Sequence, residues 1–336
     1  MAERLPLKLG VALAVGLILF ILLLSYVGFE RVSSIMVRAS PPWLAASAAI
    51  LIPFYLLRAY RWKLILMPVR NPTRLSSLFW ITGVGYMVNT LIPVRVGELA
   101  RAILVDRSEK TGFTAGLSSI AIERLLDLVA LASLGALTLS LTPFTSTPQV
   151  VIGSLKAVVL LIIALIALIF LAVRFKSGIL SLLGRLPLKA SWRQRIAGFI
   201  ESLIEAAGSM VAKPRLLASS LLLSWLLWTV FYGSYYFLFK AFNYEASALL
   251  IFTGYIFMMI TFILPAAPGY VGSFEAFWML IFLALGLKGS ETLLAMALTY
   301  HLISITAMIG LGALAASILG ISIAETLRGK GAEFQR

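Results

Sequence analysis

Long uncharged apolar runs recur along this chain and restrict the folds open to it. Leu9 to Phe29 and Leu216 to Phe239 each exceed the roughly 20 residues that a helix needs to cross a bilayer. Only 12% of the 336 residues are charged, whereas soluble domains carry about 25%. Backbone groups inside lipid must bond internally, so such runs predict helices. We therefore expect an all-α, polytopic integral membrane protein, and exclude a cytosolic enzyme, a disordered protein and a nucleic-acid binder.

The net charge of +14 is explained mainly by topology. Most lysines and arginines lie at the two termini and in residues 58–74, 95–110 and 174–215, and cytoplasmic loops collect such residues. These segments share one side only if residues 75–105 and 248–287 each enter and leave the membrane on the same side. We therefore predict about six full spans plus two re-entrant helical hairpins in a multi-pass protein of the cell membrane, with both termini cytoplasmic. Eight or more plain, kinked spans are the alternative.

The predicted hairpins divide the chain, a single membrane domain over 1–336, into two units of opposite orientation. Residues 39–141 form the first unit, with the hairpin at 75–105, and residues 215–320 form the second, with the hairpin at 248–287. Residues 174–214 form a basic cytoplasmic linker with an amphipathic helix. Both hairpins carry a Pro-x-x-x-Gly pattern, at Pro93–Gly97 and Pro268–Gly272. Opposed units with broken helices are typical of transporters, so we predict an inverted repeat.

The first candidate binding segment is NTLIPVRVGELAR, residues 89–101. Pro93 and Gly97 let the chain leave helical geometry, and freed N–H groups at the next helix start attract anions. Its polar residues are Asn89, Arg95, Glu98 and Arg101. The arginines suit a phosphate, which guanidinium groups bind in a bidentate manner, and Glu98 suits an arginine or a substrate amine. The alternative is a charged cytoplasmic loop that begins at Arg95.

The second candidate segment is AIERLLDL, residues 121–128. Glu123 and Asp127 are four residues apart and share one helix face, with Arg124 on the neighbouring face. Each ionisable group at membrane depth costs about 2.5–3.5 kcal/mol on insertion scales. The three residues therefore need mutual pairing or a wet cavity. They serve translocation, or they pair structurally with Arg95 or Arg101, and one network can do both.

The third candidate segment is ILPAAPGYVGSFEAF, residues 263–277, with hinge positions at Pro265, Pro268, Gly269 and Gly272. Ser273 is placed to cap the following half-helix. Glu275 is expected to meet a cationic headgroup or a proton from outside, or else to complement the helix dipole. His301, in the last predicted span, is either a hydrogen-bonded core residue or a proton relay.

Other chemistry has little support in the sequence. The chain has no cysteine and one histidine, so we expect no metal, cofactor or catalytic residue. No Gly-x-x-x-x-Gly-Lys-Ser/Thr motif appears, so any driving force comes from a gradient or from metabolism.

The three segments, in this order and together with LRAYRW at 57–62, resemble the lysylphosphatidylglycerol synthase transmembrane-region family, also called flippase-like or UPF0104 membrane proteins. The resemblance covers roughly residues 8–320. It implies paired re-entrant elements around a central cavity, as in the membrane part of the multiple peptide resistance factor, which moves an aminoacylated phospholipid between leaflets. Some archaeal members are linked to the assembly of lipid-attached glycans. This chain ends near Arg336, so we expect no aminoacyltransferase domain and no enzyme activity.

Three functions follow from these patterns. The first is a flippase for an anionic or phosphate-linked lipid, including an aminoacylated or glycosylated one, whose headgroup crosses a polar cavity between the hairpins. The second is a membrane-embedded transferase that acts on a lipid carrier. The third is a small-solute transporter or a partner subunit for a lipid-modifying enzyme. We expect a membrane lipid and no nucleic acid as partner, and self-association is left open.

Overall fold

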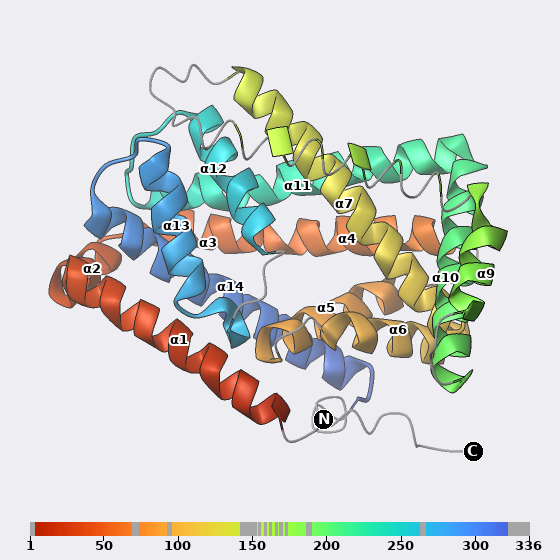
Figure 1. The fold of residues 1–336 in the computed structure, drawn as a ribbon. Helices are drawn as coiled ribbons and strands as arrows, with labels where there is room; N and C mark the ends of the chain where they lie inside the picture. The colour runs from red at the N-terminus through yellow and green to blue at the C-terminus, as the bar shows by residue number, and fades with distance from the viewer. Residues whose placement is uncertain are drawn as a thin grey trace.

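The computed structural model describes residues 4–68, 74–92, 96–141, 174–185, 190–262 and 267–321, with isolated positions between 153 and 171. Every regular element within these residues is a helix (Figure 1). The helices are α1 (Arg4–Val27), α2 (Phe29–Val37), α3 (Pro41–Ala49), α4 (Leu51–Leu66), α5 (Leu75–Leu91), α6 (Val96–Glu109), α7 (Phe113–Leu141), α9 (Lys176–Arg185), α10 (Ala190–Val211), α11 (Pro214–Ala241), α12 (Ala248–Thr261), η1 (Pro268–Tyr270), α13 (Ser273–Ala284) and α14 (Ser290–Ile318).

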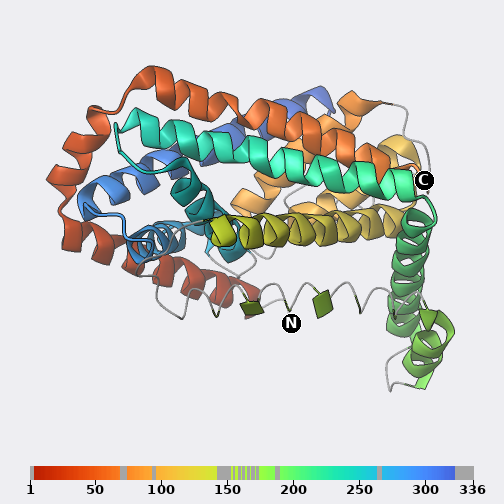
Figure 2. The same ribbon diagram turned by 90° about the horizontal axis from the view of Figure 1, so that it is seen from above.

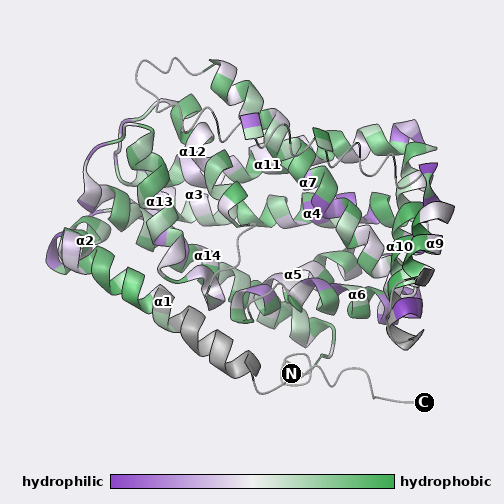
Figure 3. Cartoon of the chain, in the orientation of Figure 1, coloured by the Kyte–Doolittle hydropathy of each residue, from purple (hydrophilic) through white to green (hydrophobic). Residues whose placement is uncertain are grey.

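Three helices are long and apolar enough to cross a bilayer: Pro41–Leu66, which joins α3 and α4, Pro214–Ala241 and Ser290–Ile318. At 1.5 Å per residue each is about 40 Å long, which exceeds the roughly 30 Å hydrocarbon core. A fourth candidate is the pair Gly16–Val27 and Phe29–Val37, bent by 85°. Apolar residues cover most of the described helices (Figure 3). The chain is therefore an integral membrane protein.

Four shorter helices form two antiparallel pairs. α5 and α6 have 17 and 14 residues, and α12 and α13 have 14 and 12. At 1.5 Å per residue these helices are about 18–26 Å long, so each falls short of the hydrocarbon core. In Figure 1 the α5–α6 pair occupies the right half of the molecule and the α12–α13 pair the left half, with α14 running between them.

The α5–α6 pair is held together by a close backbone approach. A β-carbon added at Gly97 would collide with the carbonyl oxygen of Gly85. The Asn89 side-chain oxygen accepts a hydrogen bond from the Gly97 N–H at 2.8 Å. Glycine at these positions therefore allows contact that any side chain would prevent, and Asn89 satisfies a donor near the start of α6.

The two pairs meet beside the middle of α14. The Thr90 hydroxyl, near the end of α5, lies 3.5 Å from the sulfur of Met308. The Gly269 carbonyl, in η1, lies 2.6 Å from His301 Nε2. A β-carbon at Gly269 would lie 3.8 Å from the Thr90 carbonyl oxygen. Thr90 and Gly269, the described residues beside the two breaks, therefore both lie against one long helix.

The helices α9 and α10 stand nearly perpendicular to α4 and α11 at one end of the molecule (Figure 2). On α10, Ile204 is buried whereas Glu201 and Glu205 are exposed, so the helix is amphipathic. Lys176 of α9 forms ion pairs with both glutamates, at 2.9 and 2.8 Å. The hydrogen bonds to Glu205 and Glu201 raise the pKa of Lys176.

Candidate functional site

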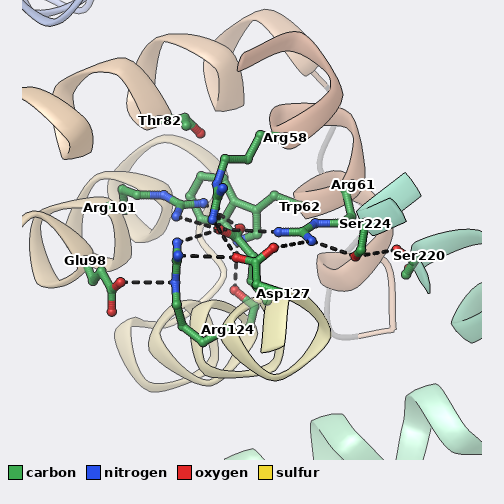
Figure 4. Close-up of polar contacts among 12 residues, drawn as sticks. Arg58, Arg61, Trp62, Thr82, Glu98, Arg101, Arg124, Asp127, Ser220 and Ser224 are labelled. Carbon is green, nitrogen blue, oxygen red and sulfur yellow. Dashed lines mark hydrogen bonds and ion pairs between the residues drawn. The ribbon is translucent and has the colours of Figure 1, made fainter. Parts of the chain in front are cut away.

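A cluster of charged side chains lies inside the protein where α4, α6 and α7 meet (Figure 4). We call it the arginine cluster. It contains four arginines and three carboxylates: Arg58 and Arg61 from α4, Glu98 and Arg101 from α6, and Glu123, Arg124 and Asp127 from α7. Charge at this depth is costly, so its arrangement requires a reason beyond packing.

Glu123 is the centre of the cluster and is fully buried. Arg101 donates to both of its carboxylate oxygens, with Nη2–Oε2 at 2.9 Å and Nη1–Oε1 at 3.1 Å. Arg58 and Arg124 each place Nη2 at 2.9 Å from Oε1. Three guanidinium groups from three helices thus share one carboxylate.

Asp127 lies one turn further along α7 and extends the cluster toward α11. Its Oδ2 lies 2.7 Å from Arg58 Nη2, and its Oδ1 lies 2.6 Å from Arg61 Nη1. The Trp228 indole N–H of α11 also donates to Oδ1, at 3.0 Å. The same Arg61 nitrogen donates to Ser224 of α11 at 2.6 Å, so the cluster ties the hairpin region to a long apolar helix.

Aromatic rings enclose the buried arginines. The Arg101 guanidinium carbon lies 4.1 Å from the centre of a Trp62 ring. The Arg58 guanidinium carbon lies 5.4–5.7 Å from the rings of Phe54, Tyr86 and Trp228. Aromatic faces attract cations, and more strongly where water is excluded. The rings therefore stabilise guanidinium groups that the carboxylates alone do not neutralise.

The cluster keeps an excess of positive charge and of hydrogen-bond donors. Four arginines face three carboxylates, and the guanidinium atoms Arg58 Nη1, Arg61 Nε and Arg101 Nε are buried without a hydrogen-bond partner. A buried donor without a partner costs about 1–3 kcal/mol. Convergent, partly unsatisfied guanidinium groups are suited to bind an anion such as a phosphate.

One edge of the cluster is accessible. Glu98 and Arg124 pair at 3.1 Å, with side-chain exposures of 22% and 28%, whereas Arg58 and Arg61 are fully buried. An anion would therefore reach the inner arginines past the Glu98–Arg124 pair.

The third candidate segment forms a separate polar site beside α14. Glu275 Oε1 lies 2.6 Å from His301 Nδ1, and Oε2 accepts a hydrogen bond from the Gly272 N–H at 2.9 Å. Glu275 therefore closes the first turn of α13 and binds the histidine. The expectation that Ser273 caps α13 is wrong: Gly272 is the N-cap, and the Ser273 hydroxyl donates to the Tyr270 carbonyl at 2.9 Å.

The hinge positions divide into described and undescribed residues. Pro268 opens η1, and Gly269 and Gly272 have φ angles of 62° and 76°, which glycine adopts without strain. Pro93, Arg95 and Pro265 lie outside the described residues. Within the described part of the chain, no group of three or more metal-ligating side chains converges.

Comparison with known proteins identifies the family. The model of the lysylphosphatidylglycerol synthase TM region matches residues 8–312, which is most of the chain. The chain belongs to this family.

Family relatives extend along the same length. A UPF0104 membrane protein of Methanothermobacter thermautotrophicus is 21% identical over 96% of this chain and 99% of its own length. A UPF0104 membrane protein of Pyrococcus horikoshii is 23% identical over 82% of this chain and 86% of its own length. Glycosyltransferase AglD of Haloferax volcanii is 29% identical over 38% of this chain, and the match spans only 21% of that enzyme. No solved structure matches the chain.

Two arginines of this lysylphosphatidylglycerol synthase TM-region chain are more deeply buried than the sequence predicts. Arg58 and Arg61 belong to the basic segment 58–74, for which a solvated helix end is expected, but α4 continues to Leu66 and both side chains are fully buried. Their spacing of three residues puts them on one helix face. That face, next to Trp62 in the LRAYRW segment, was the available signal for buried ion pairs.

Proposed function

We propose that this protein moves an anionic, phosphate-bearing lipid between the leaflets of the cell membrane. The observation that carries the proposal is the arginine cluster, in which buried guanidinium donors exceed the carboxylates available to them. A lipid phosphate supplies the missing acceptors. The family membership, which concerns the membrane region of a lipid-modifying protein, supports a lipid as the cargo.

The proposed architecture has about six spans and two re-entrant hairpins that form an inverted repeat. Support comes from the short helices α5, α6, α12 and α13, and from the contact of both breaks with α14. Irregular backbone at membrane depth is tolerated where protein or a wet cavity surrounds it. Both termini are cytoplasmic in this arrangement, and the headgroup passes between the hairpins while its chains stay in lipid.

The proposal predicts leaflet exchange by the purified full-length chain. Proteoliposomes would carry a trace of fluorescent phosphatidylglycerol, and dithionite would bleach only the outer leaflet. We expect bleaching to exceed that in protein-free vesicles and to fall when Arg124 is replaced by Gln, because this arginine lies on the accessible edge. Arg107→Gln is the matched control, since Arg107 is exposed and lies outside the cluster.

One outcome would refute lipid translocation. The protein would be folded, as judged by an unchanged thermal unfolding curve, and would exchange neither anionic nor zwitterionic lipids. An equal loss of lipid exchange in the Arg124→Gln and Arg107→Gln variants would show that the arginine cluster takes no part in translocation.

A second candidate function is a transferase that acts on a lipid carrier, favoured by the similarity to glycosyltransferase AglD. In that case the buried carboxylates would take part in acid–base chemistry. Sugar transfer to a lipid phosphate by the purified chain, lost in Asp127→Asn and kept in Arg107→Gln, would replace the first proposal with this one.

A further inference from the structure

The Glu275–His301 pair is a buried acid and base between α13 and α14. Their side chains are only 2% and 9% exposed, and Glu275 Oε1 lies 2.6 Å from His301 Nδ1. The other ring nitrogen, Nε2, lies 2.6 Å from the Gly269 carbonyl oxygen. One imidazole thus joins the helix α13, the break at Gly269 and the helix α14.

The partners of the imidazole determine how many protons the group holds. A carbonyl oxygen accepts but never donates, so the contact with Gly269 requires a proton on Nε2. The contact with Glu275 requires a second proton, either on Nδ1 beside a carboxylate or on a protonated carboxyl group. Both forms hold one proton more than a neutral imidazole beside an ionised carboxylate.

We infer that the Glu275–His301 pair is a proton-binding site that couples proton movement to lipid translocation. The inference rests on the proposed function and adds the coupling ion to it. Binding of the proton completes both hydrogen bonds of His301 and fastens the Gly269 break to α14.

Loss of the proton breaks one of these contacts. Neutral imidazole has a single N–H, so either the Gly269 carbonyl or the Glu275 carboxylate loses its donor. A buried carboxylate that loses its cationic partner is costly, so the remaining N–H stays directed at Glu275. Release of the proton therefore leaves the Gly269 carbonyl without its donor and frees the break at Gly269, beside Thr90 of the first helix pair.

Within the described residues, no competing ion contacts the pair. Among the described residues, the ion pairs and side-chain hydrogen bonds of Glu275 and His301 are those with each other, Gly272 and Gly269. The face of Phe274 lies against the imidazole, with ring centres 4.7 Å apart. α1 contributes Gly16, whose carbonyl lies against Gly272, and α5 contributes Thr90.

Among the described residues beside the pair, Tyr270 and Tyr300 are titratable, and their hydroxyl groups bond elsewhere. The Tyr270 hydroxyl donates to the Phe262 carbonyl at 3.2 Å. The Tyr300 hydroxyl shares a hydrogen bond of 2.9 Å with Ser234. Proton exchange at this site is therefore assigned to the Glu275–His301 pair alone.

The position of the pair matches that of the Arg101–Glu123 pair in the first unit. Arg101 follows Gly97 on the second helix of its hairpin and binds the next long helix, α7. Arg101 is four residues after Gly97, whereas Glu275 is three residues after Gly272 and binds α14. In the first unit an arginine supplies the positive charge, whereas the second unit has a histidine, whose two ring nitrogens can hold one proton or two.

A direct test uses the fact that the chain has one histidine. Protein labelled with ¹⁵N-histidine in lipid nanodiscs gives a single imidazole signal. We expect protons on both nitrogens, or one proton shared with Glu275. Glu275→Gln should remove the second proton, because the carboxylate partner is lost. Thr299→Val, a buried change two residues away on the same helix, should leave the histidine signals unchanged.

Two results distinguish this inference from the proposed function. Lipid exchange that is unaffected by an imposed pH gradient, and equally unaffected in Glu275→Gln, overturns the coupling site but leaves the translocase intact. A pair that binds the second proton in a protein that exchanges no lipid overturns the translocase. A histidine that stays neutral, with one unprotonated nitrogen across the whole pH range, overturns the proton site directly.

Discussion

Arg101 binds Glu123 through two parallel contacts, Nη2–Oε2 at 2.9 Å and Nη1–Oε1 at 3.1 Å, while its guanidinium group stacks on Trp62. The pair joins α6, the second helix of a hairpin, to the long helix α7. The planar fork of arginine is required for both interactions at once. This contact therefore fixes the hairpin against its neighbour and also sets the position of the other arginines around Glu123.

Replacing Arg101 by Lys tests this geometry without removing charge. Lysine keeps one ion pair but loses the second contact and the stacking on Trp62, so we expect the free energy of unfolding to fall by about 1.5–3 kcal/mol. Thermal unfolding in detergent measures the change. Arg107→Lys, on the exposed part of the same helix, should leave the unfolding curve where it is. Equal curves for both variants would show that the fork geometry is unimportant.

Replacing Glu123 by Gln tests the charge balance of the cluster. Four arginines then face Asp127 and the partly exposed Glu98 alone, and breaking a buried ion pair costs about 3–5 kcal/mol. The double variant Glu123→Gln with Arg101→Gln should recover part of this loss, because it removes one charge of each sign. Unfolding measurements on the two single variants and the double variant give the coupling between the residues. Additive losses would contradict the shared network.

The sequence allowed part of the arginine cluster to be predicted. Glu123 and Asp127 stand four residues apart in an apolar run, and their charge at that depth demanded partners. The sequence predicts Arg101 among those partners. It does not predict Arg58 and Arg61, because an apolar run followed by arginines is typical of a helix that ends in the cytoplasm. Only the tertiary structure shows that carboxylates from α7 lie beside Arg58 and Arg61.

The break near Gly269 was also predictable in position but not in detail. Prolines and glycines at 265–272 indicated that the helix is interrupted. The sequence favoured Ser273 as the cap, but the positive φ of Gly272 moves the start of the helix by one residue. Glu275 then takes over the capping hydrogen bond, and its contact with His301 depends on how α13 and α14 pack.

Replacing Gly97 by Ala tests the close approach within the first hairpin. The added β-carbon would collide with the Gly85 carbonyl and lie 2.7 Å from the Asn89 oxygen, so we expect a loss of about 1–3 kcal/mol. Gly198 of α10 has no atom within 4 Å of an added β-carbon. Gly198→Ala should therefore raise stability by about 0.5–1 kcal/mol, through helix propensity alone. Unfolding in detergent compares the two, and similar effects of both changes would refute the close contact.

Cysteine labelling tests the re-entrant arrangement, and the natural chain contains no cysteine to be removed. Single cysteines at Ser108 and Ser247, both exposed, should react with a membrane-impermeant maleimide from opposite sides of sealed, oriented vesicles. The decisive position is Thr90, near the tip of the α5–α6 pair.

In two plain spans the α5–α6 tip would emerge on the side opposite Ser108, and a cysteine at Thr90 would react there. In a re-entrant hairpin the tip stops beside Met308 in the middle of α14, so a cysteine at Thr90 should stay unreactive from the Ser247 side. Ser273 provides the converse case, because it lies at the second break, where its hydroxyl bonds to Tyr270. A cysteine at this position should not react with maleimide added on the Ser108 side. Rapid labelling of Thr90→Cys from the Ser247 side, with the unfolding curve unchanged, would establish plain spans. A tip packed against α14 leaves a bulky charged reagent no path from the Ser247 side of the membrane.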